Sequence, residues 1–144
     1  MTAATTVDPR GPRFSAIVTT VVLAVVLVSG WWPLLAAQAV VFAVGAFVGL
    51  RPAPYSVLYR RLVAPRLRPT SEREDAAPLR FAQAVGFVFA FVGTIAYATG
   101  FTTAGVVATA FALLAAFLNA AFGFCLGCEV YLLLRRSTPS RQIS

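Results

Sequence analysis

The stretch TAGVVATAFALLAAFLNAAFGFCLGCEVYLLL, residues 103–134, decides how this chain is organised. It is a long apolar run that holds both cysteines of the chain, Cys125 and Cys128, with Glu129 directly after them. As one helix the stretch would measure roughly 48 Å at 1.5 Å per residue, whereas the hydrocarbon core of a bilayer is about 30 Å thick. The run is therefore too long for a simple membrane span, and Gly123 and Gly127 are the points where we expect it to bend or break.

The composition excludes an ordinary soluble domain. Hydrophobic residues make up 59% of the 144 residues and charged residues only 12%, which predicts an integral membrane protein. All 12 basic residues are arginines at the ends of apolar segments, so a nucleic-acid-binding protein is disfavoured. Because the chain has no histidine and only the initiating methionine, the usual protein ligands of haem, zinc and copper are reduced to the two thiols. No cofactor is predicted.

Four apolar runs predict an all-α fold, a four-helix transmembrane bundle built from two antiparallel hairpins. The expected spans are residues 14–30, 33–50, 79–100 and 103–134. The links within each pair are so short that the two helices must fold back on each other. We expect a disordered tail at residues 1–12, a membrane domain at 13–136, and a flexible tail at 137–144.

The central loop, residues 51–80, is the only sizeable polar segment, and it contains seven of the arginines and five of the prolines. Within it, four apolar residues recur at the spacing of one helix face, while Arg60 and Arg61 fall on the other face; the four are Tyr55, Leu58, Tyr59 and Leu62. This pattern predicts a short basic helix that lies in the membrane interface and binds anionic headgroups.

The distribution of arginines predicts the topology. The hairpin turns Ser29-Gly30-Trp31 and Thr99-Gly100-Phe101 carry no charge, whereas the two tails and the central loop hold every arginine. By the positive-inside rule, both termini and the loop at 51–80 are cytoplasmic in a multi-pass protein of the bacterial inner membrane. The two turns also resemble each other at an offset of about seventy residues, which hints at an internal repeat.

Small residues recur in rows that are typical of close helix contact. Gly45 and Gly49 form a GxxxG pair in the second span, and alanine recurs at every fourth position of the last run, at Ala104, Ala108, Ala112, Ala116 and Ala120. Such rows let helix backbones approach closely in lipid. We therefore expect both rows to lie at helix interfaces.

The candidate catalytic residues are Cys125, Cys128 and Glu129. Two thiols in a C-x-x-C spacing can supply an attacking thiolate and a second thiol that resolves a mixed disulfide. If the backbone stays helical, the three residues share one sector of the helix, and Cys125 lies roughly 33 Å from Thr103, near the cytoplasmic edge. A desolvated Glu129 would hold a proton and exchange it with Cys128. A carboxylate beside the thiols opposes a thiolate unless a helix N-terminus points at the sulfur.

The chain also resembles a known family. The four spans, the arginine- and proline-rich loop after Arg51-Pro52, and the ending Asn119-x-x-Phe122-Gly123-Phe124-Cys125-Leu126-Gly127-Cys128 are similar to small bacterial membrane proteins catalogued as a domain of unknown function (DUF4395). The resemblance extends from about residue 12 to residue 136. It implies a membrane location and makes the cysteine pair look like a family feature, and it brings no activity or substrate.

Three functions follow from these residues. The first is thiol/disulfide exchange or sulfur relay, in which Cys125 and Cys128 react with a cytosolic thioredoxin-like or rhodanese-like sulfurtransferase partner. The alternative is a structural or accessory membrane subunit, in which the cysteines are small apolar filler. The third is the handling of a small solute or a soft metal such as copper(I), with the two thiols as ligands. The lipid bilayer is an expected partner in each case, nucleic acid is not, and an oligomer is compatible with all three.

Overall fold

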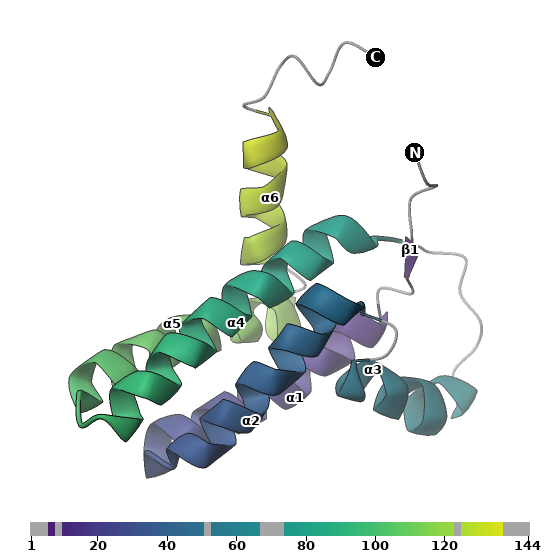
Figure 1. The fold of residues 1–144 in the computed structure, drawn as a ribbon. Coiled ribbons are helices and arrows are strands. Elements are labelled where there is room, and N and C mark those ends of the chain that lie inside the picture. The colour runs from purple at the N-terminus through teal and green to yellow at the C-terminus, as the bar shows by residue number, and fades with distance from the viewer. Residues whose placement is uncertain (1–5, 8–9, 51–52, 67–73, 123–124, 137–144) are drawn as a thin grey trace.

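The computed structural model describes residues 6–7, 10–50, 53–66, 74–122 and 125–136. Its long helices are α1 (Arg10–Ser29), α2 (Trp32–Ala43), α4 (Ala76–Ala98) and α5 (Thr102–Phe122), and a shorter helix, α6 (Leu126–Arg136), ends the described chain (Figure 1). The helix α2 continues as a π-helix, η1 (Val44–Val48), and the central loop holds α3 (Pro54–Leu58), η2 (Tyr59–Val63) and η3 (Ala64–Arg66). The predicted all-α class is confirmed.

One short ladder joins the N-terminal tail to the central loop. The strands β1 (Thr6–Val7) and β2 (Glu74–Asp75) pair antiparallel, with Thr6 opposite Asp75. Helix α1 begins at Arg10, within the stretch that the sequence led us to expect as a disordered tail. The remainder of that tail, residues 1–5 and 8–9, and the predicted flexible tail at 137–144 lie outside the described residues.

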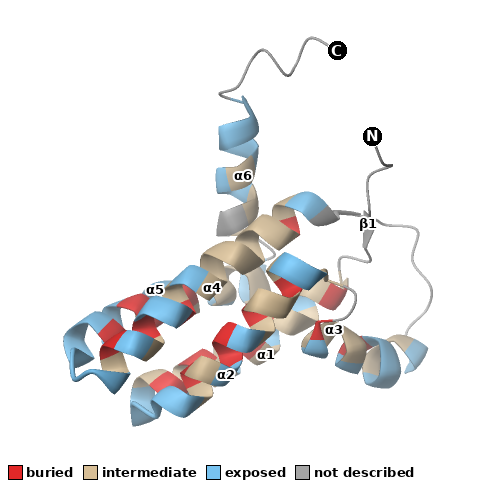
Figure 2. Cartoon of the chain, in the orientation of Figure 1, coloured by how far each residue is buried: buried red, intermediate tan, exposed pale blue. Residues whose placement is uncertain are grey.

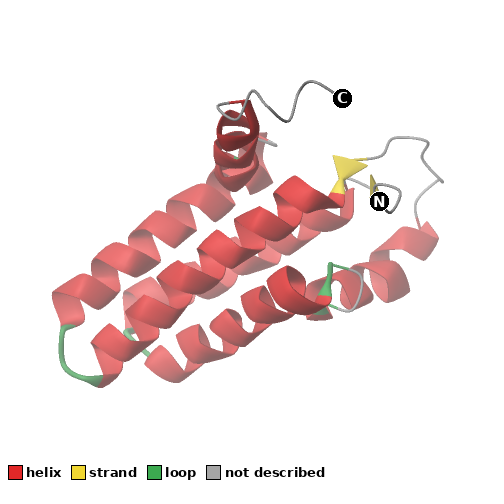
Figure 3. Cartoon of the chain, turned by 45° about the horizontal axis from the view of Figure 1, so that its top comes forward, coloured by secondary structure: helices red, strands yellow, loops and turns green. Residues whose placement is uncertain are grey.

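The four long helices lie side by side (Figures 1 and 3). Helix α1 packs against α5, and α2 packs against α4, so the first helix of each hairpin contacts the second helix of the other. Both hairpin turns lie at the same end of the bundle in both views. The start of α1, the start of α4 and the end of α5 therefore meet at the opposite end.

The two hairpin turns are built alike, as the sequence hinted. Gly30 has φ 68° and Gly100 has φ 94°, a left-handed backbone that glycine adopts without steric cost. One residue earlier, the Ser29 hydroxyl donates to the carbonyl oxygen of Val25, and the Thr99 hydroxyl donates to that of Ile95, each at 2.7 Å. These equivalences at an offset of seventy residues support an internal repeat.

Buried residues lie on the inner sides of the bundle helices (Figure 2), and many large hydrophobic residues are exposed on the outside. The core cluster is made of Leu23, Val26, Leu35, Ala39, Phe42, Ala90 and Ala112. Fewer than a third of the residues in the most apolar part of α1, α4 and α5 are buried. These three helices are long and apolar enough to cross a membrane, and Trp32–Val48 forms a shorter apolar helix.

The last apolar run is not one helix. Helix α5 ends at Phe122 and α6 begins at Leu126, so the apolar run breaks in the region of Gly123 and Gly127, where its length led us to expect a bend or break. Gly123 and Phe124 lie outside the described residues. In Figure 1, α6 runs across the direction of the bundle helices instead of extending α5.

The predicted small-residue rows are only partly at interfaces. Gly45 is buried, and a Cβ placed on it would lie 2.8 Å from Oε1 of Gln83 in α4. Gly49, by contrast, has φ 143° and ends η1, so it serves as a helix stop and not as the second half of a GxxxG contact. In the alanine row, Ala108 and Ala112 are buried, whereas Ala104 is exposed.

The apolar residues of the predicted interfacial helix do not all face the same way: some pack against the bundle and others are exposed. Tyr59 is buried, and its ring lies 5.8 Å from that of Phe14 in α1. Leu58 and Leu62 are exposed. The loop helix is therefore docked on α1 through Tyr59, which the one-face pattern did not predict.

Candidate functional site

The cysteine pair lies at the start of α6. Cys125 immediately precedes the helix, and its carbonyl oxygen accepts the first helical hydrogen bond, from the Glu129 amide at 3.0 Å. The backbone N–H of Cys128 donates to Sγ of Cys125 at 3.2 Å. The Cys125 side chain thus takes the N-cap position of α6, where serine or aspartate more often satisfies an amide of the first turn.

This position gives the Cys125 sulfur a specific electrostatic environment. The N-terminus of a helix carries a partial positive charge, because its first amide groups have no acceptor within the helix. A thiolate at the N-cap accepts a charge-assisted hydrogen bond from such an amide. The condition set by the sequence analysis, a helix N-terminus that points at the sulfur, is met for Cys125.

Cys128 lies in the first turn of α6. Both cysteines are half-buried, and neither forms a disulfide in this structure. Residues separated by one helical turn bring their Cα atoms to a distance that a disulfide can bridge. Cys128 is therefore placed to form a bond to Cys125 without a large movement of the backbone.

Glu129 follows Cys128 in the same turn but is exposed. The sequence predicts a desolvated carboxyl group at this position, and contacts within the protein do not provide one. An acidic side chain in the first turn stabilises the helix through the partial positive charge of its N-terminus. This stabilising role of Glu129 applies whether or not the residue takes part in chemistry.

Contacts with the start of α4 hold α6 in place. The ring of Tyr131 lies 5.7 Å from that of Phe81 in α4, and α6 packs along this part of α4. Arg135 donates to the Tyr131 hydroxyl at 3.2 Å and lies over its ring. The aliphatic residues Val130, Leu132, Leu133 and Leu134 are exposed. Tyr131 thus links α6 to the start of α4, behind the cysteines.

Two arginines bind the ends of helices in the opposite hairpin, and neither contact was predicted from the sequence. Arg13 in α1 donates from Nε and Nη2 to the carbonyl oxygens of Ala120 and Ala121, at 3.3 and 3.4 Å, in the last turn of α5. Arg80 in α4 donates from Nε and Nη2 to the Ala46 carbonyl oxygen in η1, at 3.2 and 2.8 Å. A cation stabilises the carbonyl-rich C-terminus of a helix. The sequence feature that could have predicted these contacts is an arginine near the start of the first helix of each hairpin.

A buried polar contact ties the central loop to α2. The Tyr55 hydroxyl donates to Oε1 of Gln38 at 2.7 Å, and Gln38 is only 1% exposed. Burial raises the pKa of Tyr55, because a phenolate would lose its hydration. Gln38 lies ten residues before the end of η1, about 15 Å along the helix. The start of α3 therefore lies alongside the bundle. Gln38, a polar residue within the second apolar run, was the sign in the sequence that a polar partner packs against this helix.

Within the described part of the chain, no group of three or more cysteine, histidine and acidic side chains is placed to hold a metal ion. Comparison with curated proteins and with solved structures finds no match. One family does match, and it covers residues 7–136, most of the chain. The resemblance inferred from the four apolar runs is thereby confirmed. The chain belongs to the DUF4395 family, a domain of unknown function.

Proposed function

We propose that the chain spans the bacterial inner membrane four times, with both termini and the central loop in the cytoplasm. Three helices have the required length, and Trp32–Val48, at about 26 Å, reaches the lower limit for a span. The hairpin turns near Gly30 and Gly100 carry no charge, whereas Arg13 and Arg80 lie near the other end of the bundle. This asymmetry supports the proposed orientation.

We infer that Cys125 and Cys128 carry out thiol/disulfide exchange at the cytoplasmic end of the bundle. The observation that carries this inference is the hydrogen bond from the Cys128 amide to Sγ of Cys125. We assign the attack to Cys125, because the start of α6 would stabilise its thiolate. Cys128, within the first turn, is the resolving residue.

The exchange balances as two displacements. The Cys125 thiolate attacks a disulfide of a cytosolic thioredoxin-like partner, forms a mixed disulfide and releases one partner thiolate. The Cys128 thiolate then attacks Sγ of Cys125, so the pair becomes a disulfide and the partner becomes a dithiol. In a sulfur relay with a rhodanese-like partner, Cys125 instead accepts the outer sulfur of the partner persulfide, and the partner leaves as a thiolate.

Glu129 is assigned the proton transfer in this scheme. Cys128 must lose a proton before it can attack, and the Glu129 carboxylate follows it directly in the chain. Because Glu129 is exposed, it can pass that proton on to water. The variant Glu129→Gln keeps nearly the same shape and should slow the resolving step without unfolding the protein.

Trapping a mixed disulfide tests the assignment. In cells that express Cys128→Ser, Cys125 should hold a partner in a complex that a reducing agent releases, whereas Cys125→Ser should trap nothing. In inside-out vesicles, a membrane-impermeant maleimide should label Cys125 in the Cys128→Ser protein.

The opposite result supports the structural alternative. It consists of no labelling in the folded protein, together with normal growth of the Cys125→Ala/Cys128→Ala double variant under thiol and sulfur stress. In that case the cysteines only fill space at the break between α5 and α6.

A further inference from the structure

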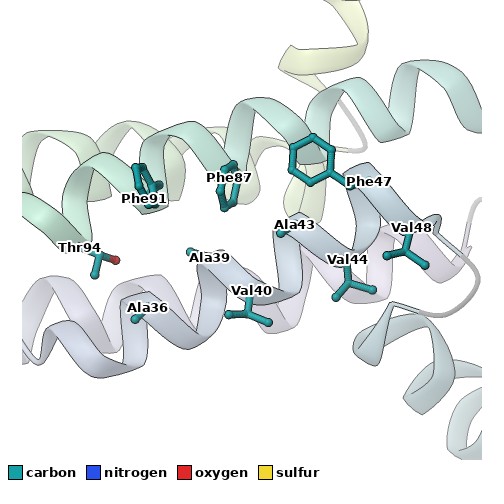
Figure 4. A pocket seen from close by; sticks show the side chains of 10 residues that line it. All are labelled: Ala36, Ala39, Val40, Ala43, Val44, Phe47, Val48, Phe87, Phe91 and Thr94. Atoms are coloured by element: carbon teal, nitrogen blue, oxygen red, sulfur yellow. The ribbon is translucent and has the colours of Figure 1, made fainter.

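An apolar groove runs between α2 and α4 on the outside of the bundle, and neither cysteine lines it. Its volume is about 520 Å³, and in Figure 4 its walls are formed by the small and branched residues of α2 and η1 on one side and by Phe87 and Phe91 of α4 on the other. Phe47 leans across from η1 and meets Phe87 edge to face, with ring centroids 5.6 Å apart. The exposure of Val40 and Phe47, 61% and 65%, leaves the groove open along its length.

The length of the groove matches one leaflet of a bilayer. On the α2 side it extends from Ala36 to Val48, a separation of twelve residues or about 18 Å. Half of the hydrocarbon core measures about 15 Å, whereas a helix that crosses the membrane would need about 30 Å of contact. The groove therefore fits an acyl chain better than it fits a partner helix.

A cation lies at the end of the groove that is remote from the hairpin turns. Arg80 lies seven residues before Phe87 and fourteen before Thr94, so it shares their face of α4. It is half-buried, and its Nε and Nη2 groups donate to the Ala46 carbonyl oxygen, next to Phe47. Its Nη1 group has no acceptor among the described residues. The π-helical turn that presents Ala46 is a rare element that often occurs at functional sites.

We propose that this groove binds an anionic glycerophospholipid of the cytoplasmic leaflet. One acyl chain lies along Val40, Phe47 and Phe91, and a phosphate oxygen accepts a hydrogen bond from Nη1 of Arg80. The occupant has to combine an anion at the level of Arg80 with an apolar chain of leaflet length, and a membrane phospholipid has both. The inference rests on the membrane location proposed above but not on the chemistry of the cysteines.

Lipid titration of the delipidated protein in mild detergent tests the proposal. Binding is read from native mass spectrometry and from the melting temperature, with phosphatidylglycerol, phosphatidylcholine and glycerol phosphate as ligands. We expect phosphatidylglycerol to bind the parent about fivefold more tightly than phosphatidylcholine, because both lipids have a phosphate but the choline ammonium cancels the net negative charge that Arg80 attracts. Glycerol phosphate, which has the anion without the chains, should leave the melting temperature unchanged.

Matched variants separate the headgroup from the chain. Arg80→Gln should abolish the preference for phosphatidylglycerol, whereas Arg66→Gln removes the same charge from the exposed η3 and should keep it. If Arg80→Gln unfolds because Ala46 loses its donors, Arg80→Lys retains the charge and should retain the preference. Ala43→Phe fills the groove and should weaken both lipids at least fivefold, whereas Val107→Phe on the exposed face of α5 should not.

Three results would overturn the proposal. The first is equal binding of both lipids by the parent, or a preference that survives in Arg80→Gln. The second is stabilisation by glycerol phosphate equal to that by the full lipid, which shows an anion site without a chain. The third is efficient cross-linking between copies through Val40→Cys in the Cys125→Ala/Cys128→Ala background, which would assign the groove to a second copy of the chain. None of these outcomes depends on trapping a thiol partner.

Discussion

Replacing Gly86 by alanine tests whether α4 and α2 approach as closely as the structure shows. A Cβ at this position would lie 2.7, 2.8 and 2.9 Å from three ring carbons of Phe42, whereas carbon atoms in contact prefer about 3.5–4.0 Å. Phe42 belongs to the core and is 8% exposed, so its ring cannot swing aside. Overpacking of this kind costs about 1–3 kcal/mol, and alanine returns about 1 kcal/mol through its higher helix propensity. The free energy of unfolding should therefore fall by about 1 kcal/mol, and by at most about 2 kcal/mol.

Gly45→Ala is the matched control for this substitution. Its new Cβ would lie 2.8 Å from Oε1 and 3.1 Å from both Cδ and Cγ of Gln83, but these atoms belong to a flexible, half-buried side chain that can move aside. We expect Gly45→Ala to leave the free energy of unfolding unchanged or to raise it by up to about 1 kcal/mol. The leucine side chain has no ring at the clash. The double variant Phe42→Leu/Gly86→Ala should therefore lose about 1 kcal/mol less free energy of unfolding than the sum of the losses in the two single variants.

Equilibrium denaturation in detergent micelles, followed by the helical circular dichroism signal, measures these differences. Either of two results would contradict the close approach of the helices. The first is equal stability of Gly86→Ala and Gly45→Ala, and the second is that Phe42→Leu destabilises the parent and the Gly86→Ala variant by the same amount. Either result would mean that α2 and α4 are further apart at Gly86 than the structure shows.

The remaining predictions concern the loop, the topology and the interface between α1 and α5. Tyr55→Phe leaves the buried Gln38 oxygen without its donor and should cost about 1–2 kcal/mol in a thermal melt. Burial raises the pKa of Tyr55 above 10.0, so the unfolded chain loses this phenol proton at a lower pH than the folded chain does. The stability that the neutral phenol contributes to the fold is therefore present below pH 10.0 and is lost above it. The free energy of unfolding of the parent should fall more than that of Tyr55→Phe between about pH 9 and 11. A periplasm-active reporter fused to either terminus should stay silent, and a positive signal would reverse the orientation and remove the cytosolic partner. Ala112→Leu adds volume at a core position that is 6% exposed and should lower the melting temperature, whereas Leu114→Met on the exposed face should not.

The class of the fold could be predicted from the sequence because it depends on local composition. Runs of apolar residues with short uncharged links leave few arrangements other than hairpins of helices, whatever each side chain contacts. The equivalence of the turns at Gly30 and Gly100 was visible for the same reason, since a tight reversal requires particular residues within a few positions. The candidate thiols could be found by their spacing and by their scarcity in the chain.

The length of the last helix could not be predicted from its hydrophobic pattern. That pattern continues through Cys125 as far as Leu134, and the break between α5 and α6 depends on competing local and tertiary contacts. Tyr131 contacts Phe81 of α4, and Arg13 binds the carbonyl groups at the end of α5. Both contacts come from segments far away in the chain.

The sequence by itself determined which segments are helical and apolar, where the cations lie along the chain, and which residues are capable of thiol chemistry. Only the tertiary structure decided that the two hairpins exchange contacts, so that Arg13 binds the end of α5 and Arg80 binds a carbonyl group of η1. It also decided that Gly86 meets Phe42, while Gly49 only ends a helix. It also decided that Cys125 caps a helix instead of lying within one. The physical reason is that a helix forms from contacts within a few residues, whereas the partner of a side chain is chosen by the arrangement of whole helices, in which distant segments compete for the same surface.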